Sequence, residues 1–451
     1  MSSTDELLAL ARATIEAARP GEAVEAYAAW GRETEVKVYE GEVESLTSAE
    51  SSGVGVRVIT EGRLGYAYAA DPDRSELAEL VERARTNAAL AAPDEGNVLP
   101  DPRPIAPLEG ILLPELLATA TEEKVRLAMD LERVCRAADS RITGVETAQY
   151  GEGIGRAAIA STSGIEAAGE RGDCWAVAVA LAGGNGETQT GFGLRIARRP
   201  SDLDVDGAGR VAADRSVRLL GARKPKTARM AVLLDPISAA SFLGVVAAGL
   251  TAESVLKGRS LFADKMGAAV ASDVVRLVDD GRALEGPGAE PFDGEGVPTG
   301  RTTLIEGGVL KAFLHNTYTA TRMGASSTGN ARRGGFKSTP GVAPTNLILE
   351  PGNETPEQLY AKAGKALLVH DLIGVHSGAN PISGDFSVGA TGVLIEGGAP
   401  GAPVREVTIA SNVLDILRGI VAVGNDMRYL PFGGAIGTPT ILVGEMTVAG
   451  T

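Results

Sequence analysis

The stretch VHDLIGVHSGANPISGDFS, residues 369–387, contains two of the three histidines of this chain, together with carboxylates, an amide and several glycines. A histidine beside a carboxylate is the combination used by general bases and by many metal sites. A metal site needs ligands that converge, but His370 and His376 are six positions apart with Gly374 between them. These histidines are therefore predicted to hydrogen-bond the backbone rather than a metal. His315, in FLHNTY, has no candidate partner nearby in the sequence and is interpreted in the same way.

A serine or cysteine nucleophile is not indicated. The chain has no G-x-S-x-G motif, and GASSTG at 324–329 is a flexible loop rather than a strand-to-helix turn. Cys135 lies in a helical pattern and Cys174 in a strand pattern, with no CxxC and no third ligand near either residue. Both are predicted to be reduced core residues.

Basic residues gather in STGNARRGGFKSTPGVAPTN, residues 327–346, which is too rich in glycine, serine and proline to form a regular element. Arg332, Arg333 and Lys337 lie there in an otherwise acidic chain, and guanidinium groups pair well with carboxylates. Two interpretations stay open. One is recognition of a peptide terminus or acidic group, and the other is a solvated loop or an internal ion pair.

The segment NPISGDFSVGATG, residues 380–392, is a third candidate site. Asn380 before Pro381 favours an extended or turn conformation, and Gly384 with Asp385 marks a turn before a strand. Such a loop can present its backbone to an extended peptide, or it can simply build the domain.

The elements that must position these residues change character along the chain. A helix capped by Ser3 or Thr4 is expected to stop at Pro20, and about four antiparallel strands with alternating apolar and polar residues are expected before a helix at 75–92. The four prolines of DEGNVLPDPRPIAPLEG predict a linker. The N-terminal α+β domain is therefore predicted over 1–93, with a Pro-rich linker over 94–113.

The rest of the chain predicts two further units. A central α+β domain is expected over 114–222, with a helix at 121–139, glycine-punctuated strands and a second helix. A β-rich C-terminal domain is expected over 228–451, opening with a strand at 229–235 and a helix at 236–250. The fold class is predicted to be α+β, with N-terminal helix-and-antiparallel-sheet units followed by a β-rich domain that has a few helices.

Composition argues against two classes of partner. Lys and Arg number 43 against 58 Asp and Glu, and the net charge of −15 repels nucleic-acid phosphates and anionic membranes. The start of the chain lacks the basic and apolar regions of a secretory signal, and no stretch reaches the roughly 18 apolar residues of a membrane span. A cytoplasmic protein without nucleic-acid or membrane partners is expected.

Six motifs follow one another in the C-terminal half. They are GNARR (329–333), STPGVAPTNL (338–347), NPISGDFSVGATG (380–392), REVTIASN (405–412), GIVAVGNDM (419–427) and GTPTILVGEMTVAG (437–450). In this order they closely resemble the TldD/PmbA family, specifically its PmbA branch, also called TldE. The likeness covers most of the chain, although before these motifs it depends mainly on organisation.

The resemblance implies a subunit of a cytoplasmic, two-chain zinc metallopeptidase that acts on unfolded or natural-product peptides. In the TldD-type partner, a helix bearing His-Glu-x-x-x-His and a later cysteine hold the zinc. The matching segment here reads VLLDPISAASFL, with Asp235, Pro236 and Ala240 in place of the histidines and glutamate, and the closing segment 424–441 has no cysteine. Pro236 cannot take a proton from zinc-bound water, and Ala240 cannot bind zinc. The resemblance thus implies no catalytic residue, metal or cofactor on this chain, and zinc on the partner.

On this interpretation the chain docks on a TldD-like subunit and forms part of a peptide cavity, which an extended peptide enters by strand addition. The residues expected to line the cavity are His376, Asn380, Asp385, Arg332 and Arg333. One alternative is a self-sufficient metal-dependent hydrolase that uses Asp235, His370 or His376. The other is a homodimeric peptide-binding scaffold without peptidase activity. Whether the chain alone is an enzyme therefore stays open.

Overall fold

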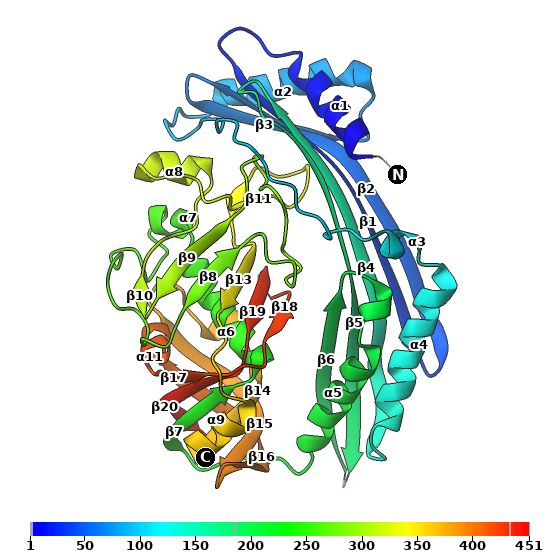
Figure 1. Ribbon diagram of the computed structural model, residues 1–451, viewed down its shortest axis with the longest axis vertical. Helices are drawn as coiled ribbons and strands as arrows, with labels where there is room; N and C mark the ends of the chain where they lie inside the picture. Colours follow the sequence, from blue (N-terminus) through cyan, green and yellow to red (C-terminus); the bar gives the residue numbers. More distant parts are fainter. Residues whose placement is uncertain (1–2, 185, 433, 451) are drawn as a thin grey trace.

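The N-terminal part of the computed structural model, which describes residues 3–184, 186–432 and 434–450, is built on one large antiparallel sheet. Its six strands have the order β3-β2-β1-β4-β5-β6 (Figure 1). They are β1 (Ala23–Tyr39), β2 (Glu42–Thr60), β3 (Arg63–Ala70), β4 (Ile142–Ser161), β5 (Glu166–Gly184) and β6 (Glu187–Ala197). Because side chains alternate between the two faces of a strand, this sheet can bury one apolar face against helices.

Helices cover that face of the sheet (Figure 1). They are α1 (Thr4–Ile15), α2 (Leu77–Leu90), α3 (Pro114–Ala118), α4 (Thr121–Ala137) and α5 (Val205–Arg218). Ser3 caps α1 as predicted, because its hydroxyl accepts from the Glu6 N–H while the Glu6 carboxylate accepts from the Ser3 N–H at 2.8 Å. The core between helices and sheet includes Leu131 of α4 and Tyr150 of β4, both fully buried.

Pairing between β1 and β4 joins the strands of the two predicted N-terminal units. The register runs from Glu25 opposite Ser161 to Val38 opposite Ala148. About four strands are expected before the helix at 75–92, but the described residues 3–76 form three, because β1 runs unbroken from Ala23 to Tyr39. All six strands share one sheet, and residues 94–113 that connect its halves form no strand and no helix.

The C-terminal part is β-rich, and the predicted α+β class is confirmed. The barrel strands are β7 (Ala228–Leu234), β14 (Lys365–Ile373), β15 (Asp385–Glu396), β16 (Ala399–Asn412) and β20 (Ile441–Ala449), with β17 (Ile420–Val423) added to β20. These strands close into a ring because β16 pairs with β20 as well as with β15. Closure gives each of those five strands a neighbour on both sides, although β16 pairs with β20 only over Thr408–Ala410.

A second six-stranded sheet lies beside the barrel, in the order β10-β9-β8-β13-β19-β18. Its strands are β8 (Leu277–Asp280), β9 (Arg301–Glu306), β10 (Val309–Leu310), β13 (Asn346–Leu349), β18 (Arg428–Leu430) and β19 (Ala435–Thr438), and a separate pair is formed by β11 (Ala331–Arg332) and β12 (Gly341–Val342). The helices of this part are α6 (Pro236–Gly249), α7 (Ala252–Leu256), α8 (Thr317–Met323), α9 (Pro356–Ala363), α10 (Val375–Gly378) and α11 (Val413–Arg418).

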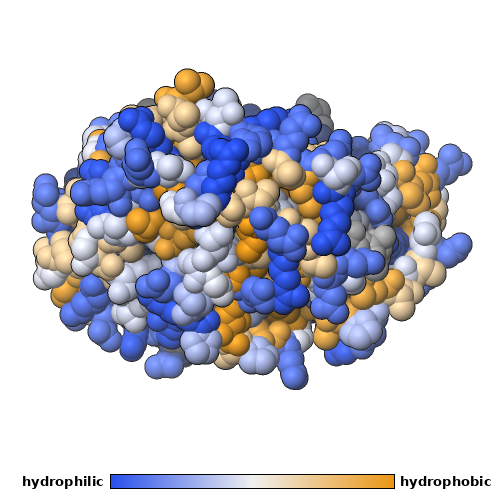
Figure 2. All heavy atoms as spheres, turned by 90° about the horizontal axis from the view of Figure 1, so that it is seen from above, coloured by the Kyte–Doolittle hydropathy of each residue, from blue (hydrophilic) through white to orange (hydrophobic). Residues whose placement is uncertain are grey.

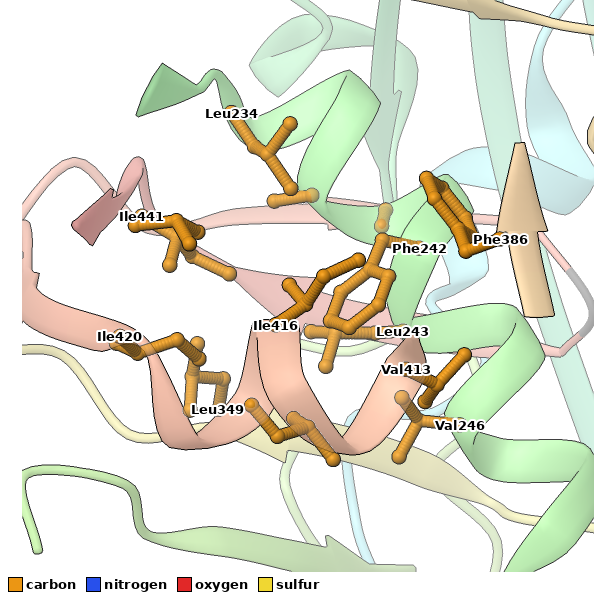
Figure 3. Packing of buried hydrophobic residues seen from close by; sticks show 14 of the residues in the cluster. Leu234, Phe242, Leu243, Val246, Leu349, Phe386, Val413, Ile416, Ile420 and Ile441 are labelled. Carbon is orange, nitrogen blue, oxygen red and sulfur yellow. The ribbon is translucent and has the colours of Figure 1, made fainter. Parts of the chain in front are cut away.

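Helix α6 is the centre of the C-terminal core. Figure 3 shows Phe242 and Leu243 of α6 among side chains from α11 and the strands, including Ile416 and Phe386. Phe242 and Phe386 meet edge to face with ring centroids 5.6 Å apart. This packing fixes the start of α6, at the end of β7, in position. Among the described helices, none combines the length and the apolar character needed to cross a membrane.

The C-terminal part packs against the second face of the N-terminal sheet. Phe336 lies against that face, and the Tyr66 hydroxyl donates to the Phe336 carbonyl at 2.7 Å. Farther along the sheet, Trp175 and Phe192 pack on the C-terminal core. Seen from above, the surface mixes hydrophilic residues with small, separate hydrophobic areas (Figure 2).

Candidate functional site

The junction between β7 and α6 places a carboxylate at a helix N-terminus. Asp235 has extended backbone and caps α6, and its Oδ1 atom accepts from the Ser238 N–H at 3.0 Å. Pro236 follows at the first helical position, where its missing N–H costs no internal hydrogen bond. The Asp235 side chain is therefore held rigidly at the end of a buried strand.

A β-bulge brings a histidine to this carboxylate. The β14–β15 register shifts between Val369 and Asp371, so that His370 is the extra residue. Bulges re-aim side chains, and here Nδ1 of His370 lies 3.2 Å from Oδ2 of Asp235. His370 is buried, and its Nε2 atom has no hydrogen-bond partner in the part of the chain that the structure describes.

An arginine from the N-terminal part completes the group, which we call the Asp235 cluster: Asp235, His370 and Arg215. Arg215 extends from α5, pairs with the Asp235 carboxylate and donates from Nη1 to the His370 carbonyl at 3.3 Å. The same nitrogen lies 3.8 Å from Oδ1 of Asp371. The cluster thus connects α5 with both α6 and β14.

Electrostatics in the Asp235 cluster favour the ion pair. Burial alone raises the pKa of Asp235, but the Arg215 cation and the bond from His370 outweigh burial and hold that pKa below its ordinary value. Asp371 is different, because burial dominates there and raises its pKa. Asp235 is consequently an anion whose charge is matched by a neighbouring guanidinium.

The donor set does not fit a catalytic zinc centre. Such a centre uses three protein ligands and one open position. In the described ranges, no three His, Cys, Asp or Glu side chains are arranged to hold a metal ion. At the Asp235 cluster one carboxylate and one imidazole meet, and the adjoining position is taken by the Arg215 guanidinium. We derive no catalytic step through a metal on this chain.

Three of the five residues predicted to line a cavity lie on one exposed loop, which we call the His376 loop (374–385). His376 is in α10 and exposed. The Asn380 side chain accepts from the Ile382 N–H at 2.9 Å, and the Ser383 hydroxyl donates to Asp385 at 2.7 Å. These bonds order the loop while leaving the His376 ring accessible.

The two arginines predicted for the cavity lie elsewhere and are engaged within the chain. Arg333 has only 1 % of its side chain exposed, pairs with Glu25 and lies over the Tyr27 ring at 4.9 Å. Arg332 pairs with Glu290 and is 24 % exposed. Among the described residues, no hydrogen bond or ion pair joins these arginines to the His376 loop. The internal ion pair, one of the two interpretations left open for this segment, describes Arg333.

Arg333 belongs to a buried ionic network that ties the sheet to the C-terminal loops. Arg57 pairs with Glu25 on one side and lies 3.0 Å from Glu295 on the other. The Glu295 carboxylate also accepts the Thr317 N–H at 2.9 Å. Removing one member would leave a buried charge without its counter-ion.

Sequence reasoning did not identify Arg215 as part of a site. The available signal was its position on the buried face of α5, in line with Ala208, Ala212 and Leu219 at helical spacing. An arginine on an apolar face needs a buried partner. Which partner it finds depends on tertiary packing, which the spacing does not reveal.

Comparison with known proteins decides the family. The chain matches PmbA/TldA metallopeptidase domain 1 over residues 24–88, the central domain over 114–220 and the C-terminal domain over 227–450. The chain belongs to the PmbA/TldD family. It is 28% identical over 428 residues to metalloprotease PmbA of Escherichia coli O157:H7, a match that covers 91% of this chain and 88% of that protein. It is also 26% identical to the PmbA homolog of Haemophilus influenzae, over 91% of this chain and 88% of that protein, so the predicted PmbA branch is supported.

Solved structures show the same fold over the whole chain. A Thermotoga maritima MSB8 crystal structure has a TM-score of 0.88 with 28% identity and covers 99% of both chains. TldE from Thermococcus kodakarensis has a TM-score of 0.89 with 24% identity, covering 99% of this chain and 100% of that one. At 24% identity, the match with TldE shows only that the two chains share a fold.

Proposed function

We propose that this PmbA/TldE-type chain is a non-catalytic subunit of a two-chain zinc metallopeptidase acting on unfolded or natural-product peptides. The observation that supports this most is the Asp235 cluster. At the junction where the TldD-type motif would begin, Asp235 is neutralised by Arg215, and the following Pro236 has no side chain able to activate water. The zinc and the glutamate base are then supplied by a TldD-like partner in the cytoplasm.

The His376 loop is the part of the chain that we assign to the peptide cavity. Its exposed imidazole and its two hydrogen-bonded turns give a rigid edge that offers polar contacts to an extended peptide. Two large apolar residues on or beside this loop, Ile373 and Ile382, are 57% and 51% exposed. Such side chains suit a surface that is covered in a complex. We therefore place the partner-facing surface on this side of the C-terminal part.

Co-expression with a TldD-like protein tests the proposal. We expect a stable pair that holds zinc and cleaves an unfolded peptide, whereas this chain alone is inert. Removing the glutamate of the partner's His-Glu-x-x-x-His motif should abolish cleavage, and His370→Ala in this chain should leave residual cleavage. A pair that keeps full activity when the partner's glutamate is removed would contradict the proposal.

One observation favours a second function, a self-sufficient metal-dependent hydrolase. Asp235 and His370 are two of the three residues named for that alternative, and the fold brings them within 3.2 Å. Their use as ligands would require the Arg215 guanidinium to leave the carboxylate. Peptide cleavage by the purified chain alone, lost on His370→Ala, would establish this function in place of the first.

A further inference from the structure

The outer half of β2 is an uncovered strand edge. β2 has 19 residues, but β3 has 8 and pairs only with Gly53–Thr60. Every residue of Glu42–Glu50 is exposed, whichever face of the sheet it lies on. Proteins usually protect such edges with short strands, prolines, bulges or charged residues, especially lysines. This segment, EVESLTSAE, contains neither proline nor lysine, and its protection is limited to three glutamates and a bulge near Glu44.

One hydrogen bond shows in which direction the unpaired backbone groups of β2 point. Asp71 N–H donates to the Ser52 carbonyl at 3.3 Å, so the backbone groups of Ser52 point to the outer side of β2. Alternate residues of an antiparallel strand share that direction. Leu46, Ser48 and Glu50 therefore direct their N–H and C=O groups outward, and in the described part of the chain no strand lies there to pair with them.

The edge is held rigidly, which favours binding over disorder. The turn between β1 and β2 is tied to α4, because the Glu132 carboxylate accepts from Glu40 N–H at 2.9 Å and from Gly41 N–H at 2.8 Å. Figure 1 shows this end of the hairpin beside α4. A rigid edge loses little conformational entropy when a strand is added.

Charge identifies the kind of strand that fits. Between Arg32 and Glu50 the hairpin carries six glutamates and two basic residues. Lys37 pairs with Glu44, which leaves a strongly acidic margin. A second copy of the same edge, placed antiparallel with Leu46 opposite Leu46, would set Glu42 against Glu50 and is disfavoured. A basic extended segment has the complementary charge.

We propose that the outer edge of β2 at Glu42–Ser52 binds an extended, lysine- or arginine-bearing segment of another polypeptide, which joins the sheet as an additional strand. Main-chain hydrogen bonds to Leu46, Ser48 and Glu50 supply affinity, and the glutamates select basic side chains. Ser45, Thr47 and Ala49 present small side chains on the second face of the sheet, so they do not obstruct neighbours on the added strand.

Amide hydrogen exchange of the full chain tests the proposal with a short peptide in which lysine alternates with valine and threonine. The expected result is slower exchange of the Leu46, Ser48 and Glu50 amides on adding the peptide, and no such effect from the matched peptide with glutamate for lysine. No protection, or protection elsewhere in the chain, would overturn the proposal. Protection that rises with protein concentration in the absence of peptide would overturn it in favour of a second copy.

Two sets of variants separate backbone pairing from charge. Ser48→Pro removes an outward donor that has no internal partner and should weaken peptide binding about tenfold, whereas Ser48→Ala keeps the N–H and should bind as wild type. If Ser48→Pro does not fold, the double variant Glu42→Lys, Glu50→Lys tests the proposal. This variant should bind the glutamate peptide in preference to the lysine peptide. An unchanged preference in that variant would overturn the charge assignment and the proposal with it.

Discussion

The Nδ1 atom of His370 lies 3.2 Å from Oδ2 of Asp235, across the interface between the barrel strand β14 and the first turn of α6. Arg215 contacts both residues from α5. A histidine and an aspartate that could serve chemistry are thereby engaged in a contact between the two parts of the molecule.

Truncating Arg215 should destabilise the protein strongly. Arg215→Ala leaves the buried Asp235 anion without its counter-ion, which costs about 3–5 kcal/mol in the free energy of unfolding. Urea denaturation followed by circular dichroism measures the change. Arg210→Ala on the same helix is the matched control, because Arg210 is 71% exposed and its truncation should change stability by less than about 0.5 kcal/mol. Equal effects of the two variants would show that the Asp235 cluster does not hold the two parts together.

Truncating the adjacent residues Arg332 and Arg333 should lower the free energy of unfolding by different amounts. Arg333→Ala should lower the free energy of unfolding by about 3–5 kcal/mol because the Glu25 carboxylate remains buried. Arg332→Ala should cost about 1 kcal/mol or less, since Arg332 and Glu290 are both partly exposed. Denaturation of both variants, with peptide cleavage by the reconstituted pair, distinguishes a structural role from a peptide contact. If Arg333→Ala keeps its stability and loses only peptide affinity, the structural role is wrong.

Stability should fall as pH rises through the range in which Asp279 titrates. Burial raises the pKa of Asp279 to about 6 although Asn330 and Thr345 donate hydrogen bonds to it. An unfolded aspartate has a pKa of about 3.9, so between these values the folded state retains a proton that the unfolded state has lost. The loss from pH 4 to pH 6 should be roughly 2 kcal/mol. Asp279→Asn should flatten the slope, and an unchanged slope would assign the pH dependence to other groups.

Changes in the His376 loop should affect peptide handling more than folding. His376→Ala removes an exposed ring and should alter the free energy of unfolding by no more than about 0.5 kcal/mol. If the loop contacts peptide, the same variant should raise KM of the reconstituted pair while kcat changes less. Lys362→Ala, an exposed control on α9, should change neither constant. An unaltered KM in His376→Ala would remove this residue from the cavity.

Local structure could be predicted from the sequence wherever nearby residues decide it. Ser3 and Glu6 are three positions apart and form the predicted cap of α1. The strand and helix on either side of Asp235 also match, because a short apolar run followed by proline at the first helical position indicates that junction. The six C-terminal motifs indicated the family, which the comparison with known proteins confirmed.

Long-range pairing could not be predicted in the same way. The alternation in β1 and β4 shows that each is a strand, but nothing in it shows that Glu25 lies opposite Ser161. Likewise, Arg333 and Glu25 are 308 positions apart in the chain, and their contact depends on how the C-terminal loops lie on the sheet. Glycine and serine around Arg333 indicated a segment without regular structure, but two short strands, β11 and β12, pair within it. Whether that segment is buried depends on tertiary packing, which the local sequence does not determine.

The central claim, that this chain contributes no zinc site of its own, is tested most directly by the metal content of the purified lone chain after exposure to zinc and desalting. We predict well below one zinc per chain, with the same value for wild type and His370→Ala, because Arg215 neutralises the Asp235 carboxylate. One zinc per wild-type chain that is lost in His370→Ala would contradict the claim.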